Sequence, residues 1–121
     1  MAHILIIDDS PTDIRVFTTL LEKAGHRVSS AGNAEDGIVA VKRERPDLVI
    51  MDVIMPGMNG FQATRTLSRD EATAHIPILI VTTKSMETDR VWGLRQGAKD
   101  FVTKPVSEKE LLARIQTLLP S

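Results

Sequence analysis

Short apolar runs alternate along the chain with segments whose apolar residues recur at helical spacing. In the run Leu48–Met51 all residues are apolar, and the carboxylate Asp52 follows immediately. Strands covered on both faces have continuous hydrophobic sequences, so this run predicts a buried strand with a charge at its carboxyl end. Four more strands are predicted at residues 4–7, 27–30, 78–81 and 101–103.

Helices are predicted between and after these strands from their capping residues. Ser10 and Pro11 open the first helix, because the missing donor of proline would be unpaired in a first helical turn anyway. Asn33 and Ser107 each precede an acid by three residues, which is typical of a helix N-terminus. Gly97 is expected to end the fourth helix, whose apolar face is predicted to contain Val91, Leu94 and Ala98. Five strands alternating with five helices indicate an α/β fold, a doubly wound parallel sheet with helices on both faces.

Composition narrows the possible functions. The 121 residues predict one domain, residues 1–121, with no output domain. The absence of cysteine excludes disulfide scaffolds, thiolate zinc sites and thiol nucleophiles, and the net charge of -1 predicts no binding of nucleic acid. The apolar N-terminal run is too short for a signal peptide or a membrane span, so no membrane insertion and a cytoplasmic location are expected.

Polar residues follow several of the predicted strands. Asp8 and Asp9, Asp52, Thr82 and Lys104 all stand at strand ends, which meet at one edge of a parallel sheet. Three carboxylates placed together repel one another unless a cation joins them. Mg²⁺ prefers oxygen ligands and retains waters, so the sequence predicts a magnesium site that leaves room for phosphoryl oxygens.

The same group of residues is suited to phosphoryl transfer. Asp52 is the candidate nucleophile, because a carboxylate can attack phosphorus and form an aspartyl phosphate. Lys104 and the ion would balance the charge on the phosphoryl oxygens, and the hydroxyl of Thr82 could donate to one of them.

Five short motifs occur in order at these strand ends. They are Asp8-Asp9-Ser10, Asp52 with the MPGMNG segment at 55–60, Thr82-Thr83, the GAKDF segment at 97–101, and Lys104-Pro105. Together they resemble the receiver domain of two-component response regulators over the whole chain. The resemblance implies a flavodoxin-like strand order 2-1-3-4-5, a sensor histidine kinase as partner and Mg²⁺ as cofactor. Residues 82–104 further resemble single-domain receivers of chemotaxis-like type IV pilus systems, which implies a role in twitching motility.

The resemblance also implies roles for individual residues. Asp52 would be the phosphoacceptor, and Asp9, Asp52 and the backbone carbonyl of Ile54 would bind Mg²⁺, with Asp8 assisting through water. Lys104 would bind the phosphoryl group through its side chain and precede a cis peptide bond to proline.

A switch and an output surface are implied as well. Thr82 and Phe101 would form the switch pair, with Phe101 turning inward on phosphorylation. A downstream protein would bind the face formed by the fourth helix, fifth strand and fifth helix. The residues assigned to this face are Arg90, Trp92, Lys99 and Phe101. Trp92 is expected to be half exposed, and packing at the border of the core explains it as well as partner contact does.

Several alternatives stay open at this point. Asp8 and Asp9 could cap the following helix, although capping does not explain Asp52 or Lys104. The protein could drain phosphoryl groups from a shared kinase instead of signalling. A haloacid-dehalogenase-like phosphatase would place an acid two residues after its nucleophile, where this chain has Ile54. A flavodoxin-like flavin module would need a phosphate-binding loop after the first strand, where two aspartates repel phosphate.

Overall fold

Strand and helix alternate throughout the computed structural model, which describes residues 1–120. The strands are β1 (His3–Ile7), β2 (Arg27–Ala31), β3 (Leu48–Met51), β4 (Ile78–Thr82) and β5 (Asp100–Thr103). The helices are α1 (Pro11–Lys23), α2 (Ala34–Glu44), α3 (Gly60–Arg69), α4 (Glu87–Gln96) and α5 (Glu108–Leu118). Each predicted strand is confirmed to within one residue at either end. No helix in this part of the chain combines the length and the apolar composition needed to cross a membrane.

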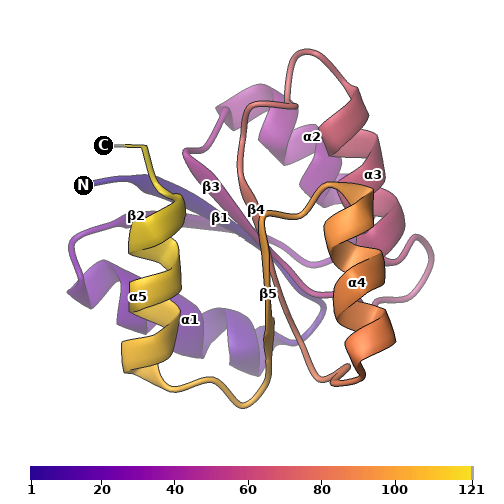
Figure 1. The fold of residues 1–121 in the computed structure, drawn as a ribbon. Coiled ribbons are helices and arrows are strands. Elements are labelled where there is room, and N and C mark those ends of the chain that lie inside the picture. The colour runs from indigo at the N-terminus through magenta and orange to yellow at the C-terminus, as the bar shows by residue number, and fades with distance from the viewer. Residues whose placement is uncertain (121) are drawn as a thin grey trace.

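The five strands form one parallel sheet in the order β2-β1-β3-β4-β5, which confirms the predicted fold class. Helices α1 and α5 cover one face of the sheet, and α2, α3 and α4 cover the other (Figure 1). All the strands run the same way, so their carboxyl ends lie at one edge of the sheet. The predicted site residues follow those ends.

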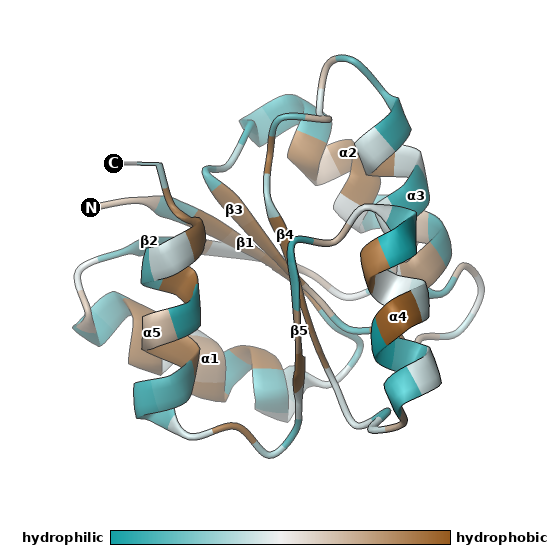
Figure 2. Ribbon diagram, in the orientation of Figure 1, coloured by the Kyte–Doolittle hydropathy of each residue, from teal (hydrophilic) through white to brown (hydrophobic). Residues whose placement is uncertain are grey.

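The two faces of the sheet explain why the strand sequences are apolar without interruption. Successive side chains of a strand point to opposite faces, so each central strand supplies both cores. Leu48 and Ile50 pack in the cluster under α1 and α5, whereas Val49 and Met51 pack in the cluster under α2 and α3. Figure 2 shows the apolar strands enclosed between helices with mostly polar outer surfaces. Burial of each large apolar side chain contributes about 1.5–3 kcal/mol.

The predicted helix caps are confirmed. The side chain of Ser10 accepts a hydrogen bond from the amide of Asp13 at 3.2 Å, and Asn33 and Ser107 accept equivalent bonds at 2.8 and 3.1 Å. Gly97 ends α4 in the left-handed conformation, with φ at 118°. A glycine adopts this conformation without strain.

The apolar face predicted for the fourth helix is confirmed only in part, because Ala98 is buried just after α4 and Leu94 is half-buried, whereas Val91 is exposed. Val91 is 40% exposed, and the buried residue of this helix is Gly93. A Cβ atom at Gly93 would lie 3.0 Å from Ile80 and 3.1 Å from Phe101. The missing side chain therefore lets the backbone of α4 approach β4 and β5 closely, and the contact is made at Gly93 and not at Val91.

Gly60, the first residue of α3, packs against the backbone beside Asp52. Its amide donates to the carbonyl of Val53 at 2.9 Å. A Cβ atom at Gly60 would lie closer to the carbonyl oxygen of Asp52 than van der Waals contact allows, and that oxygen belongs to the backbone. The start of α3 thus supports the chain segment that carries the candidate phosphoacceptor.

We expect Gly60→Ala to lower the free energy of unfolding by about 3 kcal/mol, because a backbone carbonyl cannot move aside as a flexible side chain can. Chemical denaturation would measure the change. Gly32→Ala is the control, since a Cβ atom there meets nothing within 4 Å. Equal stability of the two variants would contradict the close packing at Gly60.

Candidate phosphoacceptor site

Three carboxylates converge at the carboxyl edge of the sheet. Asp8 and Asp9 follow β1, Asp52 follows β3, and each offers an oxygen within 4.8 Å of the others. Asp8 and Asp52 are 2% and 7% exposed, whereas Asp9 is open to solvent. The predicted acidic group is therefore assembled, with one member accessible from outside.

The backbone holds Asp52 in place from both sides. Its amide donates to the carbonyl of Ile7 at 2.9 Å, which extends the pairing of β1 with β3 by one residue. Its Oδ1 accepts from the amide of Val53 at 2.8 Å, and its Oδ2 lies 3.6 Å from Lys104 Nζ. One carboxylate oxygen is thus fixed by the local chain, and the other faces a cation.

Lys104 binds two further carboxylates. Its Nζ donates to Asp8 Oδ2 at 2.9 Å and to Asp13 Oδ2 at 2.7 Å. Its backbone amide donates to the carbonyl of Thr82 at 2.7 Å, so the end of β5 is tied to the end of β4. The ammonium group also lies 5.9 Å from the centre of the Phe17 ring. Lys104 therefore stands among acids from three parts of the chain.

Asp13 was missed by the sequence analysis. It lies in the first turn of α1, where an acid has an ordinary structural explanation in the helix dipole. The available signal was its position four residues after Asp9, because α1 begins at the same sheet edge. Only the three-dimensional structure shows that its side chain reaches Lys104.

Burial and hydrogen bonding act in opposite directions on the charged groups of the site. Burial raises the pKa of Asp8 above its ordinary value, although hydrogen bonds from Lys104 and from the amide of Ser10 oppose the shift. Burial lowers the pKa of Lys104, but its hydrogen bonds to Asp13 and Asp8 outweigh this effect and the pKa is raised. Lys104 is therefore a permanent cation at physiological pH.

The two predicted switch residues are both buried. Thr82 ends β4, and its Oγ1 accepts from the amide of Lys84 at 3.4 Å. The ring of Phe101 lies against α4 at Gly93. The ring of Phe101 already occupies the inner position in this structure, and its inward turn on phosphorylation stays a prediction.

The predicted output face is only partly exposed. Trp92 is 48% exposed, as expected, and Arg90 and Lys99 also face solvent. Arg90 lies 3.4 Å from Glu87, one turn earlier on α4. Phe101, assigned to the same face, belongs instead to the core on that side of the sheet. The exposed part of the predicted output face therefore consists of Arg90, Trp92 and Lys99.

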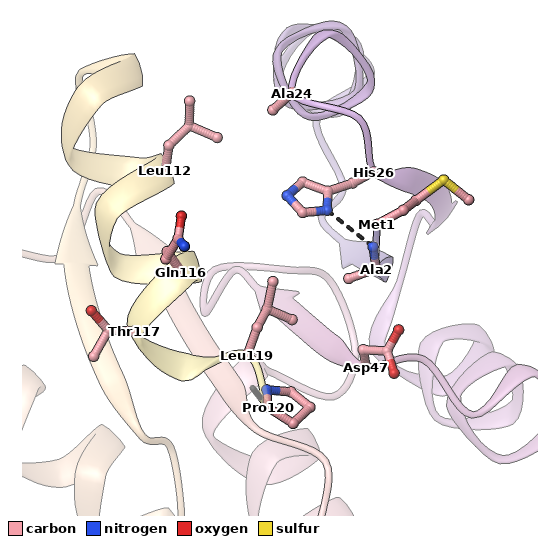
Figure 3. Close-up of a pocket in the computed structure, with 10 residues that line it drawn as sticks. All are labelled: Met1, Ala2, Ala24, His26, Asp47, Leu112, Gln116, Thr117, Leu119 and Pro120. Carbon is pink, nitrogen blue, oxygen red and sulfur yellow. Dashed lines mark hydrogen bonds between the residues drawn. The ribbon is translucent and has the colours of Figure 1, made fainter.

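A hollow of about 680 Å³ lies at the opposite edge of the sheet (Figure 3). It is lined by residues near the chain termini and around the amino ends of β1 and β3, among them Met1, Asp47 and Leu119. His26 accepts a hydrogen bond from the amide of Ala2 at 3.2 Å in one wall of this hollow. None of the predicted site residues lines it.

The donor set at the carboxyl edge fits Mg²⁺. The converging ligand atoms are all carboxylate oxygens, and the solvent exposure of Asp9 leaves an open side for retained waters. Asp8, Asp9 and Asp52 are the residues that would hold the ion. The carbonyl of Ile54 as a further ligand stays a prediction from the resemblance.

Comparisons with known proteins agree with this geometry. The sequence model of the family described as "Response regulator receiver domain" matches residues 4–116. The chain is 56% identical over 119 residues to protein PilH of Pseudomonas aeruginosa and covers 98% of each sequence. It is 38% identical to response regulator PleD of Caulobacter vibrioides, covering 97% of this chain but 26% of PleD.

Solved structures show the same fold. The chemotaxis protein CheY4 of Vibrio cholerae superposes with a TM-score of 0.92 at 29% identity, covering 98% of this chain and 99% of that one. The receiver domain of a sensor histidine kinase from P. aeruginosa, solved with a magnesium ion in its active site cleft, gives a TM-score of 0.91 at 28% identity, covering 99% and 98% of the two chains. Receiver domains generally bind Mg²⁺ at such an acidic pocket. The chain belongs to the response regulator receiver domain family.

Proposed function

We propose that this receiver accepts a phosphoryl group on Asp52 from a phosphohistidine of a sensor histidine kinase. The observation that carries the proposal is the position of Lys104 Nζ, 3.6 Å from Asp52 Oδ2 and beside the carboxylates of Asp8 and Asp13. A permanent cation next to a carboxylate nucleophile is the arrangement that stabilises incoming phosphoryl oxygens.

Each residue of the site has a distinct part in this transfer. A carboxylate oxygen of Asp52 attacks phosphorus, the phosphorus–nitrogen bond of the kinase histidine breaks, and the imidazole leaves with the bonding electrons. Lys104 balances the charge that arrives with the phosphoryl oxygens. Mg²⁺, when bound by Asp8, Asp9 and Asp52, neutralises further negative charge at this edge. Thr82 is suited to donate its hydroxyl hydrogen to a phosphoryl oxygen, because it ends β4 beside Thr103 at the end of β5.

The biological role proposed here is signalling in a type IV pilus system that drives twitching motility. The resemblance of residues 82–104 and the 56% identity to PilH support it. The receiver would act in the cytoplasm, and a protein partner would bind the face of α4, β5 and α5. A role as a phosphate sink for a shared kinase is the second candidate.

Two neighbouring side chains are placed to affect the lifetime of the phosphoryl group. Ile54 stands two residues after Asp52 and is exposed, and Lys84 stands two residues after Thr82. An apolar Ile54 orients no water for attack. Lys84 lies 3.5 Å from Asp89, an acid at the start of α4. We infer a slow intrinsic loss of phosphate.

Asp52→Asn should abolish stable phosphorylation while leaving the fold intact, because the amide is a poor nucleophile of the same shape. Labelling with acetyl phosphate and magnesium, followed by mapping of the acid-labile adduct, tests this directly. Asp47→Asn is the control, since Asp47 is an exposed acid at the other end of β3. Robust labelling of the Asp52→Asn protein at another residue would contradict the assignment.

The same labelling experiment separates the candidate classes of protein. A flavin module would not be labelled, and slow hydrolysis of the aspartyl phosphate would separate a receiver from a haloacid-dehalogenase-like phosphatase.

Magnesium should stabilise the wild-type protein against unfolding. The ion binds where the carboxylates converge, and they converge only in the folded state. At one hundred times the dissociation constant the gain is about 2.7 kcal/mol. Asp9→Asn should lose most of this gain, whereas Glu71→Gln, an exposed acid in the turn after α3, should keep it. Thermal unfolding with and without magnesium measures both. An equal gain in the Asp9→Asn protein would place the ion elsewhere.

The single tryptophan, Trp92, should report the switch by fluorescence. It lies on α4, away from the carboxylates, so magnesium alone should change its emission little. Beryllofluoride, which stands in for the phosphoryl group, should shift the emission because Thr82 would be drawn toward Asp52 and the segment leading into α4 would follow. The shift should be absent in Asp52→Asn. A full shift on magnesium alone would show that Trp92 senses something else.

A further inference from the structure

Of the three carboxylates near the ammonium group of Lys104, that of Asp13 lies closest. Its Oδ2 lies 2.7 Å from Nζ, compared with 2.9 Å for Asp8 and 3.6 Å for Asp52. The Lys104 side chain is 11% exposed. Asp13, the acid that it binds most closely, is neither the phosphoacceptor nor one of the three carboxylates that would hold Mg²⁺. Asp13 belongs to α1, whereas the other two acids follow strands of the sheet.

The two acids bonded to Lys104 differ in their contact with water. The Asp13 side chain is 37% exposed and that of Asp8 is 2% exposed. A carboxylate released into solvent is readily hydrated, whereas a buried one that loses its cation is left uncompensated. When Lys104 changes partners, Asp13 is therefore the acid that it leaves more easily.

A phosphoryl group on Asp52 supplies the reason for such a change. It would add anionic oxygens on the side where Lys104 stands 3.6 Å from Asp52 Oδ2, beyond hydrogen-bond distance. The lysine stem is flexible, so the ammonium group can move over this range. The bond to Asp13 opposes that movement.

We propose that Asp13 is a positioning residue that holds Lys104 short of Asp52 in the unphosphorylated protein. Its release accompanies the closure of Lys104 on the phosphoryl group. The strength of the Asp13–Lys104 pair thereby sets how readily Asp52 takes and keeps that group. This inference rests on the proposed function, because it needs Asp52 as the phosphoacceptor.

The test is the affinity for beryllofluoride at saturating magnesium, read from Trp92 emission. Asp13→Asn should bind it about three to five times more tightly than wild type. This range is expected when a partly exposed ion pair, Asp13–Lys104, no longer competes with beryllofluoride for Lys104. Glu108→Gln is the matched control, because Glu108 is an exposed acid in the first turn of α5. If Asp13 only stabilises α1 through the helix dipole, Asp13→Asn should lower the melting temperature and leave the affinity unchanged. Unchanged or weaker affinity would overturn the proposal.

A double-mutant cycle isolates the part of the effect that acts through Lys104. In a Lys104→Met background the gain from Asp13→Asn should largely vanish, and a full gain there would overturn the proposal. If Lys104→Met binds beryllofluoride too weakly to measure, the ¹⁵N NMR signal of the Lys104 ammonium group decides instead. That signal should shift on beryllofluoride binding in wild type, and it should already be shifted in free Asp13→Asn. An unshifted signal in the free variant would contradict the inference. Wild type that fails to bind beryllofluoride at all would instead refute the proposed phosphoacceptor.

Discussion

Charge imbalance at the carboxyl edge of the sheet is the constraint on which the site depends. Four carboxylates and one ammonium group gather there, and two of the carboxylates, Asp8 and Asp52, are almost fully buried. Removing a carboxylate from water costs several kcal/mol unless a partner compensates for it. Lys104 compensates Asp8 by a direct bond but reaches Asp52 only at 3.6 Å. The remaining negative charge is what makes the edge suitable for a divalent cation, and a bound cation in turn makes it suitable for a phosphoryl group.

The backbone ladder keeps these charges together. The amide of Asp52 donates to Ile7 in β1, and the amide of Lys104 donates to Thr82 in β4. Both bonds continue the strand pairing by one residue beyond the strands themselves. The apolar residues of the central strands, buried on both faces, hold that register, since a slip by one residue would exchange the two cores. The arrangement of these charged groups thus follows from the hydrophobic pattern.

This dependence explains how much could be predicted from the sequence. The strands, the caps and the convergence of Asp8, Asp9, Asp52 and Lys104 follow from local patterns and from the parallel topology. Asp13 could not be found in this way, because its contact depends on where α1 packs relative to the end of β5. The assignment of Phe101 to the exposed output face is wrong for a similar reason. Its side chain fills the space that Gly93 leaves open, and a missing side chain on one helix carries no periodic signal about the residue that it contacts.

The packing of α4 bears on how a change at Asp52 could reach a partner. This helix buries one residue, Gly93, whereas α3 buries five. Elements with few buried apolar contacts are the ones that shift at the lowest free-energy cost. Its contacts at Gly93 are with Ile80 of β4 and Phe101 of β5, the two strands that end in Thr82 and lead to Lys104. When Thr82 or Lys104 changes its hydrogen-bond partner, the change therefore acts on β4 and β5, which lie beneath the helix with the fewest buried residues. That helix, α4, carries the exposed Trp92.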